Sequence, residues 1–321
     1  MSVIGQDIDQ AKAFLEEGKL VGIPTETVYG LAGNALDASA VASIFEVKNR
    51  PNFDPLIVHI SARSEAEKYV REIPEALQKL ADRFWPGPLT ILLPKKEIIP
   101  DLVTSGLERV AIRVPSHPLT LNLLSRLEFP IAAPSANPFG YISPTRPEHV
   151  ADQLGDKVPY ILDGGPCKVG LESTIVGMEN GEVMIYRLGG LEIIKIEEVV
   201  GKVSIKKQSS SNPQSPGLLL SHYSPRKPLV IGDLEDLVKK YRSEGIQIAV
   251  LSLKKEFSNI PEALQIQLSP KGDMKEAAQR LFAAMRTLDE SEAELILSEW
   301  MPENGLGRAI NDRLRRAAAL V

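Results

Sequence analysis

Pro24-Thr-Glu-Thr-Val-Tyr-Gly-Leu31 follows directly on the apolar run Leu20–Ile23. A short apolar run that ends at a proline is typical of a buried strand that stops there. Thr25, Thr27 and Tyr29 then place hydroxyl groups just past the end of this strand. Ligands of open α/β sheets usually bind at strand ends, because the loops there are free to carry polar groups. We therefore expect this loop to line a binding site.

A helix and a cationic loop come next. The residues from 38 to 47 have helical spacing, and the last turn leads to Lys48 and Arg50 in a loop that Pro51 stiffens. A point charge beside a planar fork of donors suits a ligand with several anionic oxygens. Helix capping is the alternative, because cations at a helix C-terminus offset the negative end of its dipole. These residues alone leave both interpretations open.

The bulk properties limit the class of protein. A length of 321 residues predicts two domains, and 43% hydrophobic with 25% charged residues is ordinary for a soluble globular protein. A net charge of −5 and only 5% aromatic residues disfavour a nucleic-acid-binding surface. We expect a cytoplasmic protein, because the single cysteine excludes an intrachain disulfide and neither a secretory signal nor a membrane-spanning run is visible.

Further polar residues lie on or after predicted strands. His59 lies on the strand 56–60, where a lone histidine is more often a satisfied structural residue than a ligand. Arg113 points away from its apolar neighbours in the strand 110–114, so it is either a solvated edge residue or a carboxylate clamp. Ser135 and Asn137 follow the strand 130–133, as in an ordinary turn or at a phosphate-binding strand end.

A hairpin and a glycine-bearing loop complete the first half. The Asn180-Gly181 turn predicts a hairpin from Ser173 to Arg187. The preceding loop, from 163 to 170, matches neither the P-loop nor the dinucleotide fingerprint. Cys167 in that loop has no basic partner that the sequence identifies, so we expect no catalytic role for it. One cysteine and four histidines form no metal-binding pattern, and no metal site is predicted.

The sequence pattern predicts a linker and a second domain towards the C-terminus. We divide the chain into a domain at 1–201, a linker at 202–227 and a second domain at 228–321, where strands and helices alternate as in a small three-layer α/β unit. Arginines 313, 315 and 316 near its end are most simply helix-dipole partners and solvated charges.

Several short motifs follow one another along the chain, and they are Pro24-Thr-Glu-Thr-Val-Tyr-Gly-Leu31, Lys48-Asn-Arg-Pro51, Trp85-Pro-Gly-Pro-Leu-Thr90, Arg113-Val-Pro115, Pro134-Ser-Ala-Asn137, Ser143-Pro-Thr145, Glu172-Ser-Thr-Ile-Val176, Ser215-Pro-Gly217 and His222-Tyr-Ser-Pro225. In content and order they resemble the YrdC/Sua5 family of threonylcarbamoyl-AMP synthases. The remaining chain fits the longer, two-domain Sua5 branch. Each motif alone is a weak signal, but the ordered set is a strong one.

The resemblance implies a fold, a reaction and a set of site residues. The expected fold is α/β, with a YrdC-like twisted mixed-sheet domain and a smaller Rossmann-like three-layer domain. The expected reaction condenses L-threonine, bicarbonate and ATP to threonylcarbamoyl-AMP with release of pyrophosphate, for N6-threonylcarbamoyladenosine in tRNA. Mg²⁺ is expected to arrive with ATP. Lys48 and Arg50 are the expected catalytic residues. The expected threonine and bicarbonate site contains Thr25, Tyr29, His59, Arg113 and Ser173. The expected nucleotide contacts are Lys48, Arg50, Ser135, Asn137, Ser143, Arg187 and Tyr223.

The segment from Ser215 to Pro225 carries three leucines and a His-Tyr pair, which a plain spacer does not need. We expect it to fold over the nucleotide as a lid, with His222 and Tyr223 near the phosphates. Docking for stability alone is the other possibility.

Two alternatives remain open for the activity as a whole. One is an RNA-binding module without synthase activity, although we expect no stable nucleic-acid binding. The other is carbamoyl transfer from carbamoyl phosphate, as YrdC-like domains perform inside larger maturation proteins. In the expected pathway, a threonylcarbamoyl transferase acts downstream on tRNA.

Overall fold

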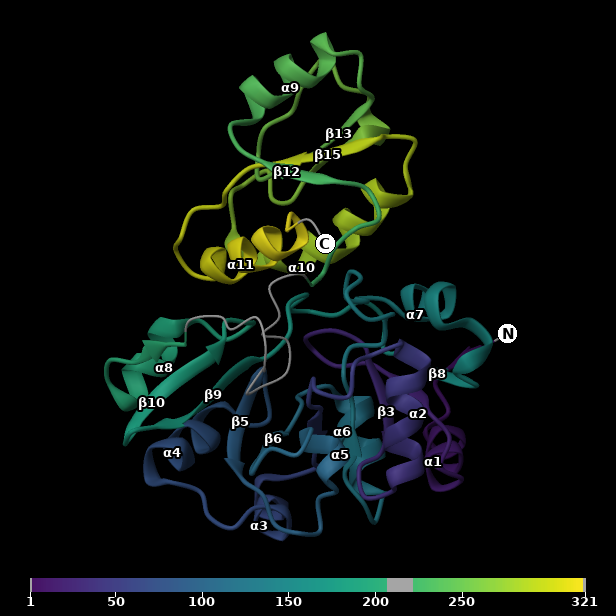
Figure 1. The fold of residues 1–321 in the computed structure, drawn as a ribbon, viewed down its shortest axis with the longest axis vertical. Coiled ribbons are helices and arrows are strands. Elements are labelled where there is room, and N and C mark those ends of the chain that lie inside the picture. The colour runs from purple at the N-terminus through teal and green to yellow at the C-terminus, as the bar shows by residue number, and fades with distance from the viewer. Residues whose placement is uncertain (1, 207–221, 320–321) are drawn as a thin grey trace. The chain divides into compact units, whose positions relative to one another are not determined.

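The computed structural model describes residues 2–206 and 222–319. The chain forms two compact units (Figure 1). Unit 1 comprises residues 1–139, 143–168 and 172–219, and unit 2 comprises residues 140–142, 169–171 and 220–321. Two short segments within the range predicted for the first domain, 140–142 and 169–171, therefore belong to unit 2, which the sequence did not predict.

Unit 1 is built on a mixed sheet with eleven strands in the described part of the chain. In spatial order they are β1 (Val3–Gly5), β8 (Tyr160–Leu162), β2 (Val21–Ile23), β3 (Gly30–Asn34), β7 (Ile131–Ala132), β4 (Ile57–His59), β6 (Arg109–Arg113), β5 (Leu89–Pro94), β9 (Thr174–Glu179), β10 (Glu182–Arg187) and β11 (Ser204–Ile205). The expected hairpin is β9–β10. β11 lies within the range assigned to the linker, where it pairs with β10 in parallel.

Alternation of side chains along the strands divides the core of unit 1 between two faces of the sheet. On one face, Val21 and Ile23 of β2 pack with α1 (Ile8–Glu16) and α6 (Pro118–Ser125). On the other face, the larger core cluster joins the sheet to the remaining helices. These are α2 (Ala38–Lys48), α3 (Ala66–Tyr69), α4 (Glu75–Phe84), α5 (Asp101–Thr104), α7 (Pro147–Leu154) and α8 (Ile193–Val200).

Unit 2 is the expected three-layer α/β domain. Its sheet is parallel, in the order β12 (Leu229–Ile231), β15 (Leu295–Ser298), β13 (Ile248–Ser252) and β14 (Gln265–Gln267). Its helices are α9 (Leu234–Ser243), α10 (Met274–Glu290) and α11 (Gly307–Ala317). Figure 1 shows α9 on one side of this sheet and α10 with α11 on the other.

The arginines near the end of α11 differ from expectation. Arg313 and Arg316 are 0% and 2% exposed, so the prediction that they are solvated charges was wrong. Their guanidinium groups lie 5.0 and 4.7 Å from the centre of the Tyr223 ring. The backbone N–H of His222 donates to the Arg316 carbonyl over 3.4 Å, which brings this segment against the helix end. The Tyr223 ring covers both cations, and the carboxylate of Asp312 pairs with both.

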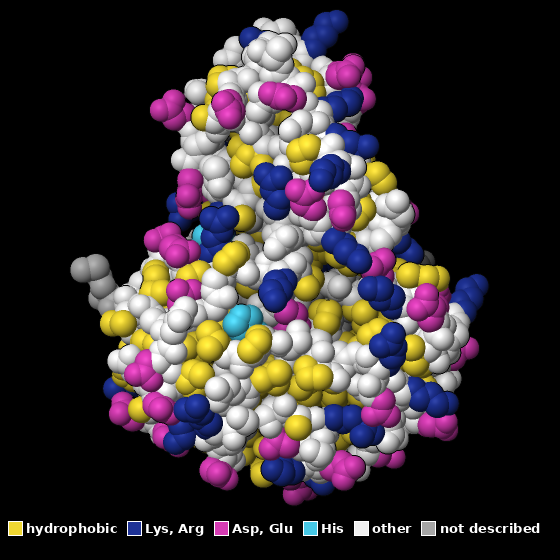
Figure 2. All heavy atoms as spheres, turned by 180° about the vertical axis from the view of Figure 1, so that it is seen from behind, with side chains coloured by type: hydrophobic (Ala, Val, Ile, Leu, Met, Phe, Trp, Pro, Cys, Tyr) yellow, Lys and Arg dark blue, Asp and Glu magenta, His cyan; other side chains and the backbone are white. Residues whose placement is uncertain are grey.

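Charged side chains of both signs lie on the face of the molecule drawn in Figure 2. Figure 2 shows basic and acidic side chains interspersed over the face that it presents. Among residues 2–206 and 222–319, no helix is both long enough and apolar enough to cross a bilayer.

Candidate active site

Four neighbouring strands of unit 1 bring a group of polar residues to one face of the sheet. Ile112 and Val114 belong to the larger core, so Arg113 between them points to the opposite face. His59 lies directly opposite Arg113 in the parallel pair β4–β6. Thr90 of β5 and Ser173, just before β9, alternate in the same way with core residues and share that face. The prediction that Arg113 points away from its apolar neighbours is therefore confirmed.

Arg113 is held by a buried carboxylate. Its Nη2 donates to Oε1 of Glu26 over 2.6 Å, and its Nε donates to the Gly87 carbonyl over 3.3 Å. Oε2 of Glu26 accepts the backbone N–H of Ser116 over 3.0 Å. Arg113 and Glu26 are only 4% and 7% exposed, so Arg113 is not a solvated edge residue. The sequence analysis assigned no role to Glu26, although this acid stands inside the first motif.

The start of the hairpin joins Ser173 to a second arginine. Oγ of Ser173 lies 2.7 Å from Oγ1 of Thr90. Arg187 donates from Nη2 to the same Ser173 oxygen over 3.1 Å, and from Nε to the Ser173 carbonyl over 3.1 Å. All three side chains are buried. Ser173 and Arg187, which were expected in different subsites, therefore lie in direct contact, and Thr90 is a contact that the sequence analysis missed.

His59 is neutral in this environment. Its Nδ1 lies 3.2 Å from the carbonyl oxygen of Ile57, and the side chain is 2% exposed. Burial, and secondly the charge of Arg113, lower the pKa of His59 to about 3. A neutral imidazole offers one donor and one acceptor to a polar ligand.

The hydroxyls of the opening loop shape the loop itself. Oγ1 of Thr25 accepts the backbone N–H groups of Thr27 and Val28 over 3.1 and 3.2 Å, which closes a tight turn. Oη of Tyr29 donates to the Gly165 carbonyl over 2.8 Å and accepts the Gly164 N–H over 3.1 Å. Both residues hold the loop that we expected at the strand end, and Tyr29 also holds the glycine-bearing loop against it.

The glycine-bearing loop can lie close to Pro24 and to the His117 ring because Gly164 has no side chain. A Cβ at Gly164 would lie 2.6 Å from Cβ of Pro24 and 2.5 Å from the His117 ring. Cys167 in the same loop is 3% exposed, and burial raises the pKa of its thiol. A buried thiol with a raised pKa is a poor nucleophile, so this environment disfavours a catalytic role for Cys167.

The second group of site residues surrounds Lys48. Its Nζ donates to the carbonyl oxygens of Ser135 and Asn137, over 2.5 Å each. The side chain is 1% exposed, and burial, followed by the nearby charge of Arg50, lowers the pKa of Lys48. The ammonium group therefore joins the loop after β7 to the end of α2, which simple helix capping would not require.

Arg50 is held by the loop that follows it. Its Nη2 lies 2.9 Å from Oδ2 of Asp54, and its Nε donates to the Asp54 carbonyl over 3.0 Å. Nη2 also donates to the Pro55 carbonyl over 2.8 Å. Asp54 is fully buried, and it is another partner that the sequence analysis missed. Its position four residues after Arg50 is the signal that could have identified it.

The remaining predicted nucleotide contacts lie in different parts of the structure. Oγ of Ser143 donates to Oε1 of Glu172 over 2.5 Å, so a buried carboxylate holds this hydroxyl. Tyr223 belongs to unit 2, where it packs with Arg313, Arg316 and Phe282. Residues 215–221 of the predicted lid lie outside the described residues.

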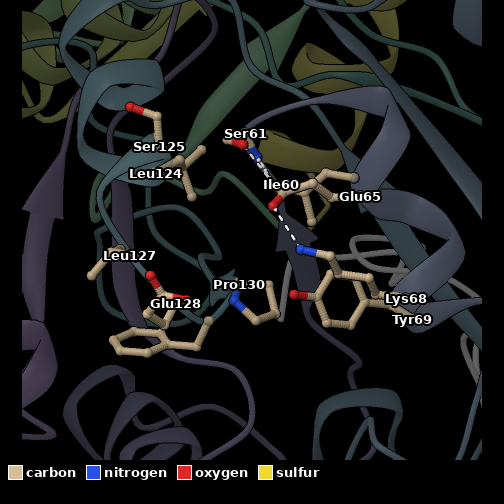
Figure 3. Close-up of a pocket in the computed structure, with 11 residues that line it drawn as sticks. Ile60, Ser61, Glu65, Lys68, Tyr69, Leu124, Ser125, Leu127, Glu128 and Pro130 are labelled. Carbon is tan, nitrogen blue, oxygen red and sulfur yellow. Dashed lines mark hydrogen bonds and ion pairs between the residues drawn. The ribbon is translucent and has the colours of Figure 1, made fainter.

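One cavity of unit 1 lies near the end of β4 but not at these residues (Figure 3). It measures about 170 Å³, and its polar lining is largely paired with itself. Oε2 of Glu65 accepts the N–H and the hydroxyl of Ser61, and Oε1 of Glu65 lies 3.2 Å from Nζ of Lys68. The described residues contain no group of three or more His, Cys, Asp or Glu side chains that could hold a metal ion.

Comparison with known proteins finds a matching family model for each of two parts of the chain. Residues 13–189 match the Sua5_yciO_yrdC family model, described as "Telomere recombination". Residues 191–319 match the model described as "Threonylcarbamoyl-AMP synthase, C-terminal domain".

The similarity extends over whole chains. The threonylcarbamoyl-AMP synthase of Pyrococcus abyssi is 41% identical, over 96% of this chain and 93% of the relative. The enzyme of that name from Bacillus subtilis is 39% identical, over 99% and 94%. The crystal structure of P. abyssi Sua5 complexed with L-threonine superposes with a TM-score of 0.92 at 38% identity, covering 99% of this chain and 97% of that one.

The large mixed sheet followed by a parallel-sheet domain thus defines a nucleotidyltransferase of the YrdC-like class. The chain belongs to the two-domain threonylcarbamoyl-AMP synthase family of the Sua5 type.

Proposed function

We propose that unit 1 condenses L-threonine, bicarbonate and ATP to threonylcarbamoyl-AMP, with release of pyrophosphate. The observation that carries this proposal is the buried polar face of the sheet, where Arg113 lies opposite His59 and Ser173 contacts Thr90. A second buried cationic group, Lys48 and Arg50, suits a triphosphate. The chain's similarity to a Sua5 structure that contains L-threonine supports the amino-acid half.

In this proposal Arg113 binds the carboxylate of threonine. A guanidinium carries five N–H donors, and the bonds to Glu26 and Gly87 use only Nη2 and Nε. Nη1 makes none of the bonds described for Arg113, so it is left to pair with a ligand carboxylate. His59 and Ser173 supply neutral polar groups, while Thr25 and Tyr29 form the wall of the pocket.

The proposed nucleotide subsite of unit 1 comprises Lys48, Arg50, Ser135, Asn137, Ser143 and Arg187. The reaction collects a carbonate-derived anion and a triphosphate in one place, so their repulsion must be offset by cations and N–H donors. Lys48 and Arg50 act as catalytic residues by stabilising this charge. Mg²⁺ carried on the phosphates would neutralise more of it, while keeping several of its waters.

The chemical steps follow from the substrates. The threonine nitrogen forms a bond to the carbonate carbon, and water leaves to give a carbamate. A carbamate oxygen then attacks the α-phosphorus of ATP, and the bond to the departing pyrophosphate breaks. Because the protein forms no covalent bond in this scheme, positioning and charge stabilisation supply the rate enhancement. The product is a mixed anhydride, which a downstream transferase would deliver to tRNA.

The lid remains part of the proposal. The segment from Ser215 to Pro225 would cover the nucleotide and exclude water from the anhydride, then reopen for product release. Tyr223 is 1% exposed and packed within unit 2, which supports unit 2 as the anchor for the end of this segment.

The two alternatives differ from this proposal in measurable ways. Interspersed charge on the surface in Figure 2 does not favour an RNA-binding module. Threonine-dependent ATP–pyrophosphate exchange without RNA would support the synthase, whereas salt-sensitive RNA binding without exchange would support the module. Product formation from carbamoyl phosphate in place of bicarbonate would support carbamoyl transfer.

A further inference from the structure

The carboxylate of Glu26 has a position that a structural role alone does not explain. It comes from the loop after β2, and it reaches Arg113 of β6 across 87 residues of sequence. One oxygen of Glu26 pairs with the guanidinium, and the other accepts the N–H of Ser116, three residues after Arg113. Glu26 therefore fixes both the side chain of Arg113 and the backbone that follows it.

The geometry of these bonds restricts the guanidinium. A planar guanidinium that is bonded at two nitrogens cannot rotate in its plane without breaking one of the bonds. Nε is held by the Gly87 carbonyl and Nη2 by Glu26, so Nη1 takes a defined position on the polar face of the sheet. Without Glu26, the neutral carbonyl of Gly87 would be left as the described partner of the Arg113 guanidinium.

The charge of Glu26 matters as well as its shape. Arg113, His59 and Glu26 lie in one buried region, and His59 is neutral there. Burying an isolated cation costs free energy, and the negative charge of Glu26 offsets the positive charge of Arg113 before any ligand binds. The pair keeps Arg113 ordered in the empty site, so that less ordering remains to be done when a carboxylate arrives.

We propose that Glu26 is a positioning residue for amino-acid binding, which orients Arg113 so that Nη1 faces the carboxylate of the substrate. This inference rests on the proposed function, in which that carboxylate belongs to threonine. Glu26 itself would make no bond to the substrate, and its effect would pass entirely through Arg113.

The test is threonine binding by calorimetry, measured without ATP on the full chain. Glu26→Gln keeps the shape and one acceptor but removes the charge, and it should raise the Kd for threonine by about 10-fold. Glu26→Asp keeps the charge but is one methylene shorter, and it should also weaken binding. ATP affinity should stay within about two-fold of that of the unaltered protein, because Glu26 lies in the amino-acid subsite. Glu179→Gln is the matched control, because Glu179 pairs with Lys206 on a partly exposed part of the sheet.

A double-mutant cycle separates positioning from simple structural support. In an Arg113→Ala background, Glu26→Gln should change the threonine Kd by less than about two-fold, because the residue it orients is gone. An equal loss in both backgrounds, or threonine binding by Glu26→Gln and Glu26→Asp as tight as in the unaltered protein, would overturn the role of Glu26. If the unaltered protein bound no threonine, the proposed function would fail, and this inference would fail with it.

Discussion

His59 and Arg113 lie directly opposite each other on the parallel strands β4 and β6, with both side chains buried on the polar face of the sheet. The two strands belong to different parts of the sequence, but their register places a neutral ring beside a cation. This relationship links the fold to the chemistry, because His59 stays neutral beside the charged Arg113.

We expect the stability of the protein to depend on pH through His59. The pKa of His59 is lowered from 6.5 to about 3, so below pH 6.5 the unfolded state takes up a proton that the folded state does not. The free energy of unfolding should therefore fall as the pH drops through this window, by up to about 1.4 kcal/mol per pH unit from this group. Urea unfolding between about pH 7 and pH 5 should show a shallower pH dependence for His59→Gln. Parallel pH dependences for the two proteins would contradict the neutral, buried His59.

The lowered pKa of Lys48 predicts that the protein takes up protons when a nucleotide binds. Burial lowers the pKa of Lys48, and a triphosphate placed beside the ammonium group would raise it again. Calorimetry of ATP binding at about pH 8.5, in buffers of different ionisation enthalpy, should show protons taken up by the complex. The Lys48→Met variant should show less uptake. Equal uptake in both proteins would remove Lys48 from the nucleotide subsite.

The Arg50→Lys variant separates the role of the planar guanidinium group from the role of its positive charge. Lysine keeps the cation but cannot reproduce the bonds to Asp54 and Pro55 together with a bidentate contact to a phosphate. We expect turnover to fall by about 100-fold, as for the loss of one charge-stabilising donor, while the charge retained beside Asp54 should limit the loss of thermal stability. Near-normal turnover in Arg50→Lys, together with full activity in Lys48→Ala, would leave only a structural role for this loop.

The threonine pocket should recognise the side-chain hydroxyl. A site with buried polar groups rejects an isostere that lacks the hydroxyl more strongly than it distinguishes a single methyl group. We expect kcat/KM for valine to be at least about 100-fold below that for threonine, with serine between them. Valine adenylated as efficiently as threonine would show that the pocket has been assigned wrongly.

The lid can be tested by limited proteolysis. ATP together with threonine should protect the peptide bonds around residues 219–223, because closure over the nucleotide would keep the protease from them. Tyr223→Ala should lower activity. Cleavage at one rate with and without ligands, combined with full activity of Tyr223→Ala, would exclude the lid.

The parts of the fold that local patterns specify could be predicted from the sequence. The β9–β10 hairpin follows from Asn180-Gly181 between apolar strands, and β2 follows from an apolar run that ends at Pro24. β3 was not predicted, because Gly-Leu-Ala-Gly-Asn lacks the β-branched and aromatic residues typical of strands. Pairing with β2 and β7 stabilises this strand, although its composition does not favour one.

The partners of the site residues were harder to predict, because they are distant in sequence. Lys48 reaches two carbonyl oxygens in the loop after β7, and Arg113 reaches Glu26, contacts that no spacing rule could reveal. The burial of Arg313 and Arg316 was missed for a similar reason. Their helical spacing marks one face of α11, but it does not show that Tyr223 covers that face.

The central claim is that unit 1 joins threonine, bicarbonate and ATP at the buried polar face of its sheet. The most direct test is to incubate the purified protein with these three substrates and Mg²⁺, without RNA, and to identify the products by mass spectrometry. The account predicts threonylcarbamoyl-AMP and pyrophosphate in equal amounts, dependent on each substrate and strongly reduced in Arg113→Ala. Pyrophosphate release without threonine, or no threonylcarbamoyl-AMP from an active, folded protein, would contradict it.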